Sequence, residues 1–169
     1  MKKRKFFAQK MLRAKYSNAT MQIDLGKVEN GLQCAQYRLD NAVMQSMIPY
    51  MPKQTGTFIN VTQGMSQAIA GSGKVVAAAP PMGRYLYEGK VMVDAETGKG
   101  PQKIPIGPGD AYLLRFRKGA KLKATDRPLQ YSKHANPKAT DHWFEAARER
   151  DEKAWIRIAQ KGLEEGMKK

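Results

Sequence analysis

The stretch "GLQCAQYRLDNAVMQSMIPYMP" constrains the fold of this chain more than any other. Its apolar residues recur at intervals of three and four, which places them on one face of an α-helix. The members of this stripe are Leu32, Ala35, Leu39, Ala42, Val43, Met47 and Tyr50. Asn30, with Gln33 three residues later, is the predicted N-cap, and Pro49 and Pro52 end the helix. A helix over 31–48 with one apolar face requires a second element to cover that face.

The closing stretch supplies that second element. Trp143 and Trp155 stand on either side of the charged run "RERDEK", and each is followed by apolar residues at helical spacing. Asp141 and Asp151 can cap two separate helices, and one continuous bent helix over 141–163 is equally allowed. In both cases we expect the tryptophans to pack against the 31–48 helix and a small sheet. The expected core residues are Leu39, Val43, Trp143, Phe144, Trp155 and Ile158.

Several shorter stretches have the composition of β-strands. "MQIDL" (21–25) alternates, and "TFINVTQ" and "KVVAAA" are rich in β-formers and are predicted to pair as a hairpin around "GSG". Residues 94–110 hold four glycines and three prolines, which predicts a long loop, and a strand is expected over 112–117. The sequence therefore predicts an α+β fold with a small, mainly antiparallel sheet. Its parts are a basic arm over 1–20 and a single domain over 21–169.

The chain carries 30 Lys and Arg residues against 15 Asp and Glu residues, a formal net charge of +15. Such a charge favours anionic partners without identifying them. Two basic clusters are candidate partner-facing or DNA-facing sites. They contain Lys2, Lys3, Arg4 and Lys5 in the arm, and Arg115, Arg117, Lys118, Lys121 and Lys123 in a later tract. Strand alternation would place Arg115 and Arg117 on one face. A solvated basic face, or one that meets an acidic protein, is the alternative interpretation.

No motif of catalysis or cofactor binding stands out. "GSGK" lacks the earlier Gly and the following Ser or Thr of a phosphate-binding loop, because those positions are Ala68 and Val75. The single cysteine, Cys34, lies in the apolar helical pattern and is expected to act as a small hydrophobe. Neither His134 nor His142 has neighbours at metal-ligand spacing. We expect no catalytic, metal or cofactor site, and no membrane span, because no apolar run approaches about 20 residues.

The order of the segments carries more information than any one of them. "MQIDLGKVENGL", "MIPYMPKQTGTF" and "AAAPPMGRYLYEGKVMVDAETGKG" are followed by "RPLQYSK" and "HANPKATDHWFEAARERDEKAWIRIAQKG". Together these stretches, over 21–163, resemble the minor capsid proteins of tailed bacteriophages of Gram-positive hosts. More distantly they are similar to the tail-completion, or head–tail joining, proteins of long-tailed phages. The arm over 1–20 and the loop over 94–110 depart from that pattern.

The resemblance implies a structural virion protein at the phage neck, without catalysis or cofactors. Its implied partners are further copies of the chain in a ring, other neck, portal-side or tail proteins, and packaged DNA passing through. Its implied location is the virion, assembled in the host cytoplasm. The rival hypothesis is a small basic nucleic-acid-binding protein without catalytic activity, which explains the charge but not the ordered segments.

Overall fold

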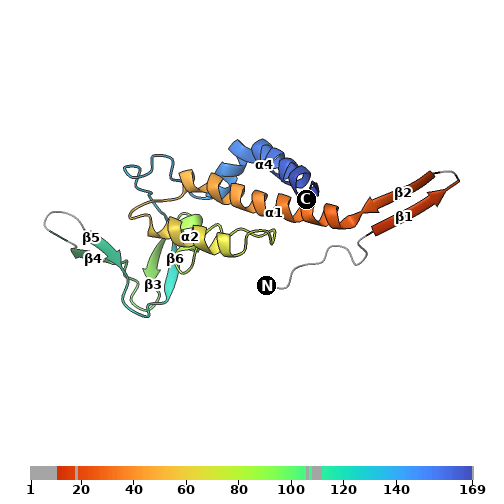
Figure 1. Ribbon diagram of the computed structural model, residues 1–169. Coiled ribbons are helices and arrows are strands. Elements are labelled where there is room, and N and C mark those ends of the chain that lie inside the picture. Colours follow the sequence, from red (N-terminus) through yellow and green to blue (C-terminus); the bar gives the residue numbers. More distant parts are fainter. Residues whose placement is uncertain (1–10, 18, 106, 108–111, 169) are drawn as a thin grey trace.

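The computed structural model describes residues 11–17, 19–105, 107 and 112–168. Over that range the chain forms four α-helices, one short 3-10 turn and six β-strands (Figure 1). The two long helices, α1 and α4, pack on each other, and the strands form three separate antiparallel pairs. The predicted α+β class, with a long helix in the first half packed on a C-terminal helix, is confirmed.

Helix α1 (Leu25–Met47) begins six residues before the predicted start. The side chain of Asp24 accepts hydrogen bonds from the backbone N–H groups of Gly26, at 2.9 Å, and Lys27, at 3.4 Å. Asp24 is therefore the N-cap, and the prediction of Asn30 for that role is wrong. The helix passes into the 3-10 turn η1 (Ile48–Tyr50), so the proline at 49 marks its end as expected.

Helix α4 (Trp143–Met167) is one continuous helix and runs antiparallel to α1 (Figure 1). The continuous alternative is thus the correct one, and neither Asp141 nor Asp151 is its N-cap. Glycines let the two backbones come close. A Cβ atom added to Gly162 would lie 2.8 Å from the Cα of Ala35, and one added to Gly31 would lie 2.9 Å from the carbonyl oxygen of Leu163. Side chains at these glycines would separate the helices.

The core forms where the end of α1 meets the first half of α4. Its buried members are Val43, Met44, Met47, Met51, Ile59, Trp143, Ala147 and Trp155. The indole N–H of Trp143 donates to the carbonyl oxygen of Ala77 at 2.8 Å, and that of Trp155 donates to the Ser46 hydroxyl at 3.0 Å. Each buried ring therefore keeps a partner for its one polar group.

The six predicted core residues divide into three groups. Val43, Trp143 and Trp155 are buried, as expected, and Leu39 and Phe144 are half-buried against that cluster. Ile158 is 36% exposed, so its assignment to the core is wrong. Ile158 lies three residues after Trp155 and four before Gly162, so it stands at the edge of the α4 face that contacts α1, where it keeps that exposure.

The predicted hairpin over 57–79 is wrong. Residues Thr57–Ala68 form helix α2, and "KVVAAA" runs alongside it without strand pairing. Two buried hydroxyls explain this arrangement. The Ser66 hydroxyl donates to the Val76 carbonyl and accepts from its N–H, both at 3.0 Å, and the Thr62 hydroxyl accepts from the Ala79 N–H at 3.2 Å. Side chains of a helix thus supply the hydrogen bonds that a partner strand would otherwise give.

The glycine turn after α2 binds a carboxylate of the chain itself. The Asp40 carboxylate accepts hydrogen bonds from the N–H groups of Gly71, at 2.7 Å, and Gly73, at 3.1 Å. Both glycines have positive φ, 86° and 75°, a conformation that favours glycine. The Gln36 side chain donates to the same carboxylate at 2.7 Å. The "GSG" turn therefore anchors α1 through Asp40. Its N–H groups bind this carboxylate of the chain itself, as the sequence reasoning against a phosphate-binding loop allows.

The strands form three antiparallel ladders. Strands β1 (Met11–Tyr16) and β2 (Ala19–Asp24) pair with each other, so part of the predicted arm is a hairpin. After the short helix α3 (Gly83–Tyr87), strand β3 (Lys90–Asp94) pairs with β6 (Leu122–Pro128). Strand β4 (Gln102–Pro105), inside the predicted loop, pairs with β5 (Tyr112–Arg115). Figure 1 shows the β1–β2 and β4–β5 hairpins projecting at opposite ends of the molecule.

Candidate interaction surface

The later basic tract lies at the end of the molecule formed by β3–β6 and β4–β5. Strand β5 ends at Arg115, two residues before the predicted end, and the chain returns through a turn to β6. Four predicted cations, Arg115, Lys118, Lys121 and Lys123, are exposed there. Within the part of the chain that the structure describes, none of the four forms an ion pair. We name this surface the basic end.

Arg117 has a structural partner instead. Its guanidinium binds the Asp94 carboxylate at the end of β3 and the Glu96 carboxylate in the following turn. Asp94 is 3% exposed and also accepts a hydrogen bond from the Glu96 N–H at 2.9 Å. The Arg117 guanidinium, with that N–H, lowers the pKa of Asp94 to about 2. Because β5 has ended, alternation no longer relates the two arginines, and Arg117 ties the turn to β3.

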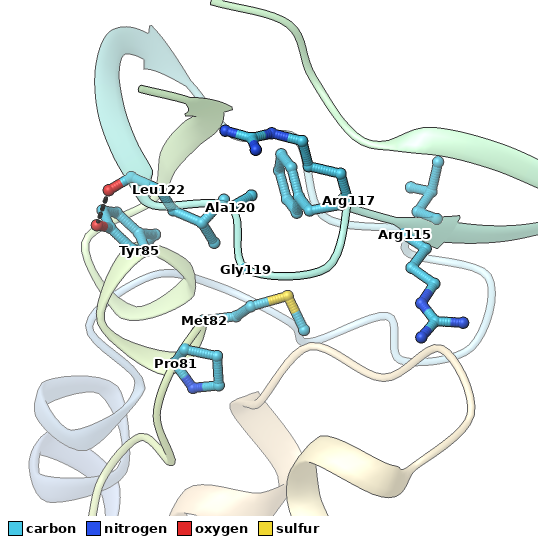
Figure 2. A pocket seen from close by; sticks show the side chains of 10 residues that line it. Pro81, Met82, Tyr85, Arg115, Arg117, Gly119, Ala120 and Leu122 are labelled. Atoms are coloured by element: carbon cyan, nitrogen blue, oxygen red, sulfur yellow. Dashed lines mark hydrogen bonds between the residues drawn. The ribbon is translucent and has the colours of Figure 1, made fainter. Parts of the chain in front are cut away.

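A hollow of about 360 Å³ lies between the basic end and helix α3 (Figure 2). Its lining residues are Pro81, Met82, Tyr85, Leu114, Arg115, Phe116, Arg117, Gly119, Ala120 and Leu122. The Tyr85 hydroxyl donates to the Leu122 carbonyl at 2.8 Å and so holds α3 against β6. Figure 2 shows the side chains of Arg115 and Arg117 leading away from each other. The hollow combines apolar walls with the Arg115 guanidinium, which has no ion-pair partner among the described residues, and this arrangement suits contact with a partner.

Sequence reasoning found the cations of this hollow but missed its walls. Pro81 and Met82 come from the segment before α3, more than 30 residues from Arg115. No pattern in the neighbouring residues indicates that Pro81 and Met82 face the basic end, because both residue types are common in loops. Lys2, Lys3, Arg4 and Lys5, the other predicted cluster, lie outside the described residues.

A second candidate surface runs along the α1–α4 pair. An open groove of about 470 Å³ is lined by Leu32, Ala35, Leu39, Glu152, Trp155, Ile156, Ala159, Gln160 and Leu163. We name it the α1–α4 groove. Ile156 is 54% exposed and Leu32 is 37% exposed. Large apolar side chains grouped in a concave surface mark contact sites more often than isolated ones do.

Several titratable side chains gather at the start of α4, where the Tyr87 and His142 ring centroids are 5.2 Å apart. His142 lies at the start of α4 with its ring nitrogen 3.7 Å from Asp141, and both side chains are half exposed. The Tyr87 hydroxyl donates to Glu145, and burial together with that carboxylate raises the pKa of Tyr87. Among the described residues no group of three or more His, Cys, Asp or Glu side chains is placed to hold a metal ion.

Comparison with protein-family models, with curated proteins and with solved structures gave no match. Within the described ranges, no helix combines the length and the apolar content needed to cross a bilayer.

Proposed function

We propose that this chain is a structural virion protein of a tailed bacteriophage, which builds part of the neck or head–tail connector as an oligomeric ring. The ordered resemblance of its segments over 21–163 supports the virion assignment. The proposal gives the protein no catalytic role and no cofactor. Its partners are further copies of the chain and the neighbouring proteins of the neck or tail.

The extent of the molecular surface supports the oligomeric part of the proposal. The chain exposes 12379 Å², whereas a compact monomer of this length exposes about 8,300 Å². Complete exposure of every undescribed residue would account for about 2,800 Å² of the difference. The remainder is comparable with the roughly 800 Å² that one protein contributes to a stable interface. A subunit with two projecting hairpins has the surface to contact two neighbours.

The rival function, a basic nucleic-acid-binding protein, has one observation in its favour. The basic end carries four exposed cations that form no ion pair within the described residues. Contacts of this kind bind phosphates without sequence preference and weaken steeply with salt. The same cations can meet packaged DNA in a connector, so the two functions differ in assembly and in DNA affinity of the free protein.

The deciding experiment is a nonsense mutation in this gene, followed by electron microscopy of the lysate. We expect full heads and finished tails that fail to join. Heads without tails would keep the virion assignment but move the protein to tail assembly. Normal infectious particles would reject the structural function, and salt-sensitive DNA binding by a monomer would then favour the rival.

A further inference from the structure

Strand β2 of the β1–β2 hairpin carries two apolar side chains, Met21 and Ile23, that the other described residues leave exposed. Its register sets Leu12 opposite Ile23 and Ala14 opposite Met21, whereas the intervening positions of β2, Thr20 and Gln22, stand opposite lysine and arginine. On β2, Met21 and Ile23 therefore share one face, and Thr20 and Gln22 share the other. Met21 is 59% exposed and Ile23 is 38% exposed. An isolated two-stranded hairpin is only marginally stable in water, so we expect a partner to cover this face.

The hairpin does not lie on the groove of its own chain. Strand β2 ends at Asp24, and α1 begins at the next residue with Asp24 as its N-cap. No linker separates the two elements, so the start of the helix sets the direction of the hairpin. Figure 1 shows it continuing beyond the start of α1, away from the α1–α4 pair. No described part of the chain therefore covers either the Met21 and Ile23 face or the α1–α4 groove.

The α1–α4 groove matches the hairpin in size and in chemistry. From Leu32 to Leu39 it follows α1 for about 10 Å, and the β2 stretch from Ala19 to Ile23 is about 13 Å long. Glu152 is the only charged residue that lines the described groove. A chain with a net charge of +15 repels its own copies. Contact between copies is therefore best made where apolar surfaces meet and cations are few.

We propose that the β1–β2 hairpin of one subunit docks, by its Met21 and Ile23 face, into the α1–α4 groove of the next copy of this chain. This inference rests on the proposed ring and names its subunit contact. A single type of contact then covers both open surfaces of every subunit. Because the two surfaces differ, the contact is head-to-tail, and repetition closes a ring when the rotation between subunits divides a full turn.

The test compares two matched pairs of variants by light scattering and sedimentation of the full chain. On the hairpin, Met21→Glu with Ile23→Glu is compared with Thr20→Glu with Gln22→Glu, which adds the same charge to the opposite face of β2. On α4, Ile156→Glu in the groove is compared with Ile158→Glu outside it. We expect the wild type and both controls to form one discrete oligomer. The hairpin and groove variants should be monomers, with the dissociation constant raised roughly 30-fold or more. Circular dichroism checks that each variant is folded.

Mixing the hairpin variant with the groove variant tests directly whether the hairpin binds the groove. The groove variant keeps an intact hairpin and the hairpin variant keeps an intact groove, so the mixture should form a 1:1 dimer that grows no further. A mixture that remains monomeric would overturn the inference. So would a groove variant that still assembles, because hairpins would then be pairing with something else.

Failure of this inference is distinguishable from failure of the proposed function. If both disrupted variants form the wild-type oligomer, the ring stands and its contact lies elsewhere. A monomeric wild type rejects docking between copies, whereas the lysate of the nonsense mutant decides the virion function independently.

Discussion

Gly162 on α4 lies directly against Ala35 on α1, and a Cβ atom on residue 162 would be 2.8 Å from the Ala35 Cα. Real Cβ atoms do not approach that closely, so a side chain would push the helices apart. We expect Gly162→Ala to lower the free energy of unfolding by about 1–3 kcal/mol, the cost of overpacking a filled interface. Urea denaturation measures it.

Gly64 on helix α2 is the matched control, because a Cβ there would meet nothing within 4 Å. Gly64→Ala replaces glycine in a helix interior without a clash and should stabilise the protein by about 0.5–1 kcal/mol. Opposite signs for the two substitutions are the expected result. A stabilising Gly162→Ala would show that α1 and α4 do not pack at this distance.

Trp155 tests the core of the helix pair. It is buried, and its indole N–H donates to the Ser46 hydroxyl at 3.0 Å. Trp155→Ala should cost about 3–5 kcal/mol, whereas Ile158→Ala, at a partly exposed position of the same helix, should cost well under half of that. Thermal unfolding followed by circular dichroism compares them. A shift of only a few degrees for Trp155→Ala would place the ring at a subunit contact instead of the core.

The Arg117–Asp94 pair predicts a dependence of stability on acid. The pKa of Asp94 is about 2 in the folded chain, below the value of about 3.9 in an unfolded chain. A depressed pKa contributes stability above the unfolded value, and that contribution disappears as the pH falls from about 4 towards 2. Arg117→Gln should therefore lower the melting temperature at pH 6. The difference in melting temperature between the variant and the wild type should become smaller as the pH falls from about 4 towards 2.

Arg115→Gln is the control for that experiment. Arg115 is exposed and, within the described ranges, has no carboxylate partner, so its removal should leave the melting temperature nearly unchanged at every pH. Equal losses for both arginines at pH 6 would mean that the Arg117 pair does not hold the turn to β3.

The basic end predicts a change in salt dependence. Replacing Arg115, Lys118, Lys121 and Lys123 by Gln should weaken non-specific DNA binding by the free protein. If all four meet phosphates, the slope of log affinity against log salt should fall by about 3–4. The control replaces four other exposed lysines by Gln and so lowers the net charge by the same amount. These are Lys27, Lys53, Lys153 and Lys161. Equal effects would show that net charge alone drives the binding. Fluorescence anisotropy at several salt concentrations measures both.

Local and periodic patterns in the sequence were enough to predict some of the elements. The apolar stripe through Leu39 and Val43 predicted α1, and the spacing around Trp143 and Trp155 predicted the helical C-terminal stretch and two buried rings. These predictions succeeded because one face of a helix repeats along the chain itself, so its burial can be inferred without knowing which element covers it.

Other features depend on contacts between residues that are far apart in the chain. The β-rich composition around Thr62 and Ser66 favoured strands, yet their hydroxyls hold the 76–79 backbone from within a helix. The sequence suggested that Arg117 is a partner-facing cation, but in the fold it pairs with Asp94, 23 positions earlier. Gly162 shows no sign of a contact in the sequence, and only the approach of α1 makes it a contact residue. In each case the contact that determines the role of the residue is made with a partner distant in the chain. The pattern of neighbouring residues does not identify such a partner.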